Sequence, residues 1–215
     1  MDMYDLHVHS VLSDGELIPA EIARRYAVKG YRAVAITDHA DSTNLEFLVR
    51  SLQGVREELE GHGIRVVAGV ELTHVPPGDI PKLAERARSL GAELVLVHGE
   101  SLVEPVAAGT NRAAVSCRHV DVLAHPGLIT PEDAELAAAN GVLLELSLRR
   151  GHCLSNGHVA RVAAEAGAEL ILGSDAHAPG DIPDARLMLE AAMGAGLTRS
   201  QSEIVANVNP ERLLK

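Results

Sequence analysis

Short apolar runs alternate with amphipathic segments along almost the whole chain of 215 residues. Seven runs rich in Val, Ile and Leu predict strands over residues 4–9, 33–37, 65–71, 94–98, 121–125, 142–147 and 170–174. The segments between them predict helices over residues 19–30, 44–63, 80–92, 130–141, 156–168 and 183–196. Repeated strand–helix units give parallel strands joined by helical crossovers. This alternation therefore restricts the chain to the α/β class.

The apolar runs are continuous rather than alternating, which is typical of strands buried on both faces. A doubly wound open sheet is the alternative, but no G-x-G-x-x-G motif follows the first run. No linker interrupts the pattern, and segment 99–120 is expected to mix loop with helix. Barrels of roughly 200 to 250 residues commonly form one domain. We therefore predict a distorted (β/α)7 TIM-like barrel that forms a single domain over residues 1–215.

The balance of charge and cysteine limits the partners and the compartment. The chain has 19 basic and 30 acidic residues and a net charge of −11, so we do not expect it to bind nucleic acid. Cys117 and Cys153 are too few for a disulfide framework, which favours a reducing cytoplasm. No signal-peptide pattern or bilayer-length apolar run is present, so we expect no membrane partner. The oligomeric state stays open.

Histidine and acidic residues gather where the predicted strands end. "DLHVHS" places His7 and His9 two residues apart, so both side chains leave the strand on one side. In a barrel, the carboxyl ends of the strands form the active-site face. Further side chains at this face are Asp38, His39, Glu71, His98, His125, Asp175 and His177. Because unpaired polar groups at a buried rim are costly, a shared cation is their natural partner. Imidazole and carboxylate without thiolate favour a catalytic Zn, Mn or Fe site.

The ordered motifs "DLHVHS", "TDH", "GVE", "VHG", "AHPG" and "GSDAH" resemble those of the PHP (polymerase and histidinol phosphatase) superfamily. The resemblance extends from Asp5 to His177, and the order of six motifs makes it specific. It implies a distorted seven-stranded barrel that holds two or three divalent metal ions. It also implies that Asp38 orients a ligand rather than serving as one.

The same resemblance implies three ligand sets that share residues. They are His7, His9, Glu71 and Asp175 for one metal; Glu71, His98 and His125 for a second; and Asp14, His39 and His177 for a third. Many relatives place His in the loop that here carries Asp14, within "LSDG". This departure is expected to shift the third site toward Mn or Fe. The alternative is that Asp14 only caps a turn before the helix near Pro19.

A multi-metal pocket of this kind favours hydrolysis of a phosphate ester. We expect a small phosphorylated substrate, a monoester such as a histidinol-phosphate-like compound, a nucleotide or a sugar phosphate. Glu71, Asp175 and His177 are the predicted catalytic residues, and Arg112, Arg149 and Arg150 are the predicted phosphate-binding residues. Each arginine could instead be a solvated loop charge. His152 and Asn156 are further candidate substrate contacts, and Glu145 stays unassigned.

Other functional classes compete with the phosphatase. One is a PHP enzyme that cleaves phosphodiesters or nucleic acid, which the acidic charge and the scarcity of aromatic residues, 2% of the chain, disfavour. Another is an amidohydrolase-type enzyme that cleaves C–N bonds and usually carries a modified Lys at strand four. Here His98 occupies that place, and Lys29, Lys82 and Lys215 lie at no predicted strand end. A metal-stabilised interaction module would be expected to lose ligands, but this chain retains nearly all of them.

Overall fold

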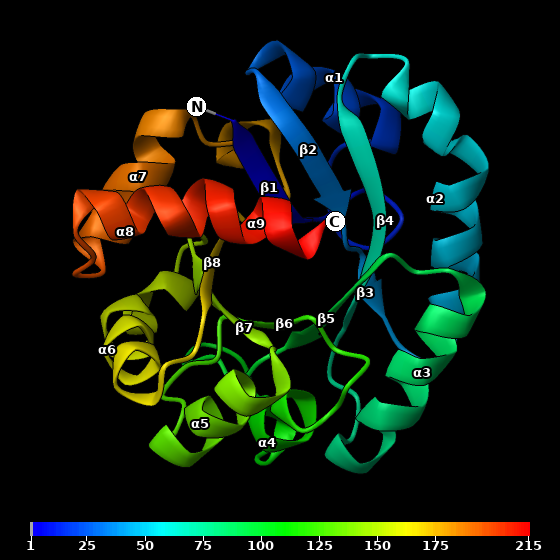
Figure 1. The fold of residues 1–215 in the computed structure, drawn as a ribbon. Helices are drawn as coiled ribbons and strands as arrows, with labels where there is room; N and C mark the ends of the chain where they lie inside the picture. Colours follow the sequence, from blue (N-terminus) through cyan, green and yellow to red (C-terminus); the bar gives the residue numbers. More distant parts are fainter. Residues whose placement is uncertain (1) are drawn as a thin grey trace.

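The structure, a computed structural model, describes residues 2–215 and contains a nearly closed barrel of parallel strands surrounded by helices (Figure 1). The hydrogen-bonded order is β1-β2-β4-β5-β6-β7-β8. The strands are β1 (Met3–Val8), β2 (Tyr31–Ile36), β4 (Arg65–Leu72), β5 (Leu94–His98), β6 (Val122–Ala124), β7 (Leu143–Ser147) and β8 (Leu170–Gly173). The predicted distorted seven-stranded barrel is confirmed.

A short additional strand, β3 (His39–Ala40), separates from β2 and pairs with the end of β4. The sequence pattern predicted one strand over residues 33–37, but β2 ends at Ile36. At this break β4 carries Gly69, where a Cβ atom would lie 2.7 Å from the side chain of Thr37. The glycine therefore lets the chain after β2 approach β4 closely. The break places His39 beside Glu71 at the carboxyl end of the barrel.

The barrel closes between its first and last strands through the segments that carry the histidine motifs. The backbone N–H of His9 donates to the carbonyl of Ala176 at 2.9 Å, and that of Asp175 donates to the carbonyl of His7 at 2.9 Å. Val8 and Ala176 form the corresponding parallel bridge. Closure therefore joins the two His-x-His-like motifs, which are distant in sequence.

Helices surround the strands as the alternation predicts (Figure 1). They are α1 (Pro19–Val28), α2 (Leu45–Glu60), α3 (Ile80–Leu90), α4 (Thr110–Val115), α5 (Pro131–Asn140), α6 (Asn156–Ala166) and α7 (Ala185–Gly194). The six predicted helices end slightly earlier than expected because glycines stop them. Gly141, for example, follows α5 with a φ of 70°, a left-handed conformation that ends a helix. Segment 99–120 contains the loop and the short helix that were expected.

The amino end of the barrel is apolar inside and is covered by the end of the chain. The interior cluster consists of Leu6, Ala35, Val67, Leu94, Leu96, Val122, Leu143 and Ile171, with Leu213 and Leu214 packed against it. Helices α8 (Arg199–Glu203) and α9 (Asn209–Leu213), red in Figure 1, cross this end with a π-helical turn between them. Short helices carry little periodicity, and the sequence did not predict them. Within residues 2–215, no helix has the length and apolar character needed to span a membrane.

Candidate metal centre

The polar side chains predicted at the strand ends converge on Glu71, which lies at the carboxyl end of β4 and is fully buried. Five imidazoles lie close to its carboxylate. The nitrogen-to-oxygen distances are 3.5 Å for His7, 3.6 Å for His9, 2.7 Å for His39, 3.2 Å for His98 and 3.4 Å for His125. One carboxylate therefore lies close to groups that come from β1, β3, β5 and β6 or directly follow them.

The first predicted ligand set is compact. His7 Nε2 and His9 Nε2 lie 3.1 Å apart, and Asp175 Oδ1 is 3.3 Å from His9 Nε2 and 3.8 Å from His7 Nε2. His7 lies in β1 and His9 directly follows it, and both side chains point toward the same face, as their spacing predicted. Asp175 follows β8, which is next to β1 in the closed barrel. The donor atoms of His7, His9 and Asp175 lie close enough together to hold one divalent cation, and Glu71 lies within 3.6 Å of both histidines.

The second predicted ligand set contacts the same carboxylate of Glu71. His98 Nδ1 and His125 Nε2 both approach the Oε1 atom of Glu71. His98 is the last residue of β5, and His125 follows β6, so the two side chains come from neighbouring strands. Their rings lie 4.4 Å apart between centroids. The same Oε1 atom is also 3.5 Å from His7 Nε2, so the Glu71 carboxylate contacts members of both predicted ligand sets.

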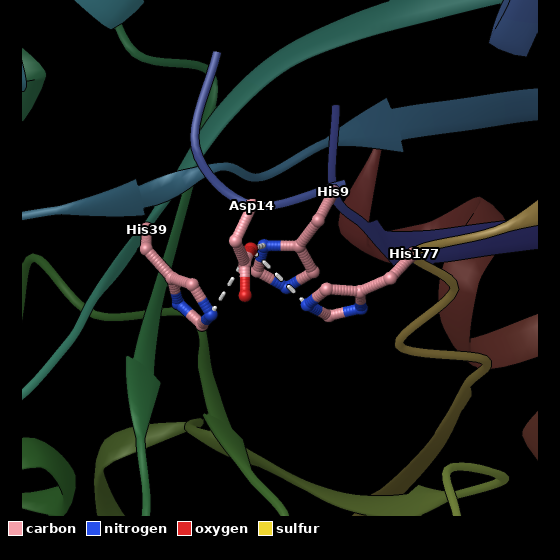
Figure 2. A group of neighbouring side chains, drawn as sticks. All are labelled: His9, Asp14, His39 and His177. Atoms are coloured by element: carbon pink, nitrogen blue, oxygen red, sulfur yellow. Dashed lines mark ion pairs between the residues drawn. The ribbon is translucent and has the colours of Figure 1, made fainter. Parts of the chain in front are cut away.

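The third set surrounds Asp14. The Oδ1 atom of Asp14 is 3.2 Å from His177 Nε2, 3.6 Å from His39 Nε2 and 3.9 Å from His9 Nδ1. Figure 2 shows the three imidazoles gathered around this carboxylate. The loop folds back onto β1, and a Cβ atom at Gly15 would lie 2.4 Å from the carbonyl oxygen of His9. The close return of the loop therefore requires glycine after Asp14.

Asp38 holds this loop rather than a ligand histidine. Its Oδ1 atom accepts hydrogen bonds from the backbone N–H of Ser10 and the hydroxyl of Ser13, both at 2.7 Å. Its Oδ2 atom accepts one from the Ser10 hydroxyl at 2.7 Å. Asp38, which lies just after β2, thus anchors the loop that carries Asp14. The sequence had indicated an orienting role for Asp38, and the group it orients is the loop.

Two predicted ligands have strained backbones. His125 has a φ of 28° and Asp175 a φ of 52°, both in the left-handed region. His74, whose φ is 52°, is the third such non-glycine residue in the described part of the chain. Each such residue costs of order 1–3 kcal/mol, and such strain persists where surrounding structure imposes it. The strained residues His125 and Asp175 follow β6 and β8 at the site, which indicates that contacts within the site hold the backbone in this conformation.

Glu145, in the middle of β7, contacts one member of each of the first two predicted ligand sets. Its Oε1 atom is 2.7 Å from His7 Nδ1, and its Oε2 atom accepts a hydrogen bond from the backbone N–H of His125 at 2.9 Å. A Cβ atom at Gly173 would lie 1.8 Å from Oε1, so glycine leaves space for this carboxylate. The sequence had left Glu145 unassigned because a mid-strand position does not show which neighbour it contacts.

The electrostatics of the centre depend on imidazoles packed around buried acids. Burial opposes ionisation of Glu71, but the surrounding imidazoles, His98 first, hold the pKa of Glu71 well below its ordinary value. Burial likewise opposes ionisation of Asp175, and His7 leads the groups that lower the pKa of Asp175. Burial lowers the pKa of His9 to about 4. Burial opposes protonation of His7, His39 and His98, but nearby carboxylates raise the pKa of each above its ordinary value. Metal binds neutral imidazole and anionic carboxylate, so an ion at this centre would displace those protons.

The donor atoms fit divalent metal ions. The Nδ1 atom of His9, which faces Asp14 at 3.9 Å, is buried without a hydrogen-bond partner within the described structure, a costly state unless something else binds it. The donor groups are imidazoles and carboxylates. Of the two cysteines, Cys117 belongs to the hydrophobic core outside the site and Cys153 is exposed. This donor set suits Zn, Mn or Fe.

The three predicted phosphate-binding arginines occupy different places. Arg149 Nη1 lies 2.8 Å from His177 Nδ1 and 3.2 Å from the carbonyl oxygen of Asp175. Arg150 joins Arg149 and Asp175 in lining a cavity of about 550 Å³. Arg112, on α4, instead contacts Asp133 on α5. The structure thus brings Arg149 and Arg150 to the rim and leaves Arg112 on the helical layer.

Two further candidates and one unpredicted residue complete the rim. His152 stacks on His125 with 4.0 Å between ring centroids, and its Nδ1 atom is 2.6 Å from the hydroxyl of Ser101. Asn156 instead bonds through its amide to the backbone of Ser147 at 2.8 Å. Glu104, from the loop after β5, lies 2.8 Å from His98 Nε2. No strand-end pattern marks Glu104, so the sequence contained no signal for it.

Comparison with known proteins places this geometry in a family. The chain is 47% identical to an uncharacterized protein of Methanocaldococcus jannaschii, over 99% of this chain and 98% of that one. It is 30% identical to a probable phosphatase of Shewanella loihica, over 81% and 78% of the two chains. The fold resembles histidinol phosphate phosphatase from Lactococcus lactis, solved with zinc, L-histidinol and phosphate, with a TM-score of 0.63, 15% identity and coverage of 92% and 95%. Because residues 5–167, more than half of the chain, match the PHP domain family, the protein belongs to the PHP family.

Proposed function

We propose that the protein is a metal-dependent phosphoesterase that hydrolyses a small phosphate monoester, such as a histidinol-phosphate-like compound, a nucleotide or a sugar phosphate. The observation that carries this proposal is the convergence of five imidazoles on the fully buried carboxylate of Glu71. Membership of the PHP family and the similarity to a probable phosphatase support it. The related fold of a histidinol phosphate phosphatase agrees with this reaction.

Three groups of side chains would hold two or three ions of Zn, Mn or Fe. The groups are His7, His9, Glu71 and Asp175; Glu71, His98 and His125; and Asp14, His39 and His177. Ions in these places supply Lewis acidity and positive charge for a phosphoryl group. Glu71, Asp175 and His177 are the proposed catalytic residues, because each would contact an ion beside the reacting group. Glu145 fixes the ring of His7 through its Nδ1 atom.

Arg149 and Arg150 are the residues that we propose bind the phosphate group of the substrate. The chain carries a net charge of −11, so an anionic substrate needs positive charge near the reaction site. Arg149 reaches the edge of the cluster at His177, and both arginines line the cavity beside Asp175. A planar guanidinium can bind two phosphate oxygens at once. We propose that these arginines orient the phosphate while the cavity accepts the rest of the substrate.

The proposal is tested by assaying metal-reconstituted protein against a panel of phosphomonoesters, phosphodiesters and amide or lactam substrates. We expect release of inorganic phosphate from monoesters, its loss after exhaustive chelation, and its return with Mn, Zn or Fe. Faster cleavage of diesters would favour the nuclease-type alternative. Hydrolysis of C–N bonds without phosphate release would favour the amidohydrolase alternative. Full turnover by protein verified as metal-free would contradict metal dependence.

A pair of arginine variants tests the substrate side with a matched control. Arg149→Ala should raise KM for a phosphomonoester because it removes a phosphate contact at the rim. Arg112→Ala should leave KM unchanged because Arg112 contacts Asp133 on the helical layer. Equal effects of both variants, or an effect of Arg112→Ala alone, would contradict this assignment.

A further inference from the structure

The loop after β5, residues 99–109, is tied firmly to the barrel. The Oε1 atom of Glu100 accepts hydrogen bonds from the backbone N–H groups of Gly109 and Asn111, at 3.0 and 2.9 Å. The amide of Asn111 donates to the carbonyl of Pro126 at 2.8 Å, and its oxygen accepts from the backbone N–H of Glu100 at 3.0 Å. These bonds fix both ends of the loop. The position of Glu104 in the loop is therefore set by the scaffold.

The carboxylate of Glu104 lies among three imidazoles. Its Oε2 atom is 2.8 Å from His98 Nε2 and 3.8 Å from His74 Nε2, and its Oε1 atom is 3.4 Å from His152 Nε2. His98 and His152 are buried, while Glu104 is 35% exposed. A carboxylate held against three imidazole nitrogens belongs to the polar centre and not to the solvated surface. The proposed ligand sets do not include it.

His98 faces Glu71 through its Nδ1 atom, as His39 does. His7 and His125 direct Nε2 toward the Glu71 carboxylate, but His98 directs Nδ1 toward it at 3.2 Å. The Nε2 atom of His98 consequently points away from Glu71 and toward the loop. That atom is buried and has no aligned hydrogen bond within the described structure. Glu104 is 2.8 Å away, and the terminal torsion of a Glu side chain turns readily into alignment.

A metal-binding imidazole commonly donates its second ring N–H to a carboxylate, which fixes its tautomer and raises its basicity. For His98 to bind metal through Nδ1, the proton must reside on Nε2. We propose that Glu104 is a positioning residue that holds His98 in this tautomer and so strengthens metal binding by Glu71, His98 and His125. This inference rests on the proposed function because it requires a metal at that set. Glu145 gives His7 the same support from the barrel wall.

The experiment measures Zn²⁺ binding by calorimetry and metal content in wild type, Glu104→Ala and Glu104→Gln, without substrate. Glu104→Ala should weaken one Zn²⁺ equivalent by about 10–100-fold, the effect expected for loss of such a partner. Glu104→Gln should retain most of the affinity because its amide oxygen still accepts the N–H. Glu165→Gln, on the surface of α6, is the matched control and should bind as wild type. Unchanged Zn²⁺ affinity in Glu104→Ala would overturn the proposal.

Two further measurements separate positioning from other roles. Nitrogen-detected NMR of the zinc-loaded protein should show a proton on His98 Nε2 that is lost or shifted in Glu104→Ala. His74→Asn keeps a residue that tolerates the left-handed backbone and should retain the full metal content. If His74→Asn and Glu104→Ala each lose the same Zn²⁺ equivalent, Glu104 is itself a ligand and the proposal is wrong. Because no assay here uses substrate, failure of the phosphatase proposal would be seen separately.

Discussion

The two ends of the barrel differ sharply although the same strands build both. At the amino end, side chains such as Val67 and Leu94 pack into an apolar interior that Leu213 and Leu214 cover. At the carboxyl end, β4 and β5 continue into Glu71 and His98 within a buried cluster of acids and imidazoles. Apolar burial stabilises folding, whereas buried charge costs free energy unless it is paired. The amino end therefore stabilises the fold and offsets the free-energy cost of the buried charges at the carboxyl end.

The largest predicted effect falls on the carboxyl end. Glu71→Gln replaces the shared anionic bridge with a neutral amide, so it should lower metal content and reduce turnover by several orders of magnitude. The apolar interior is untouched, and circular dichroism should show an intact fold. Metal analysis and single-turnover phosphate release check the prediction. A variant with full metal content and near-normal turnover would remove Glu71 from the centre.

The complementary change falls on the apolar interior. Leu94→Ala, four residues before His98 on the same strand and paired with Gly69, should reduce the free energy of unfolding by about 2–5 kcal/mol because it opens a cavity. Turnover per folded molecule should stay close to that of the wild type. Denaturant unfolding together with an active-site titration measures both quantities. A matching loss of turnover per folded molecule would show that the two ends are not separable.

The sequence predicted the convergent part of the site because barrel geometry itself brings it together. His7 and His9 share one face of β1, and carboxyl ends of parallel strands meet at one rim. Asp175 and Glu71 could be placed by the same rule. Arg112 is a different case, because it follows β5 in sequence, yet α4 carries it to Asp133. Its place at the rim stays a prediction without support from the geometry.

Other parts of the site depend on tertiary contacts that no local pattern contains. Glu104 reaches His98 only because Glu100 and Asn111 hold its loop against the barrel. Glu145 lies within an otherwise apolar strand, and only the structure shows that β8 places Gly173 beside its carboxylate. The C-terminal helices α8 and α9 are too short for a clear period, and their burial against the barrel stabilises them. Strand alternation therefore predicts the barrel, whereas the contacts of Glu104 and Glu145 are seen only in the structure.

A smaller effect is predicted for the hydrogen bond between Tyr26 and the buried Asp5. Asp5 is buried, burial raises its pKa to about 6, and the Tyr26 hydroxyl donates to it at 2.7 Å. Tyr26→Phe should cost about 1.5–3 kcal/mol above pH 6, where Asp5 is ionised and accepts a charge-assisted bond. The cost should shrink as pH falls through about 6, since the neutral acid accepts a weaker bond.

Tyr31→Phe is the control for this pH dependence. Its hydroxyl donates to the carbonyl of Pro183 at 3.1 Å, a neutral partner, so its cost should not vary over the same range. Denaturant unfolding of both variants across the pH range measures the difference. If both costs are equally flat, Asp5 does not change its ionisation in that range.

The smallest predicted effect tests the most exposed member of the polar end. The Asp14 side chain is 54% exposed, yet its carboxylate lies within 4 Å of three imidazoles (Figure 2). Asp14→Ala should remove one metal equivalent and lower turnover about tenfold, because His39 and His177 alone hold an ion weakly. Asp14→His should recover much of both, with a shift of preference from Mn or Fe toward Zn, since imidazole is a softer ligand. Metal content by mass spectrometry and turnover with each metal check this. If Asp14→Ala keeps its full metal content and only lowers the melting temperature slightly, Asp14 caps the turn before α1. The metal centre then consists only of the buried residues at the carboxyl end.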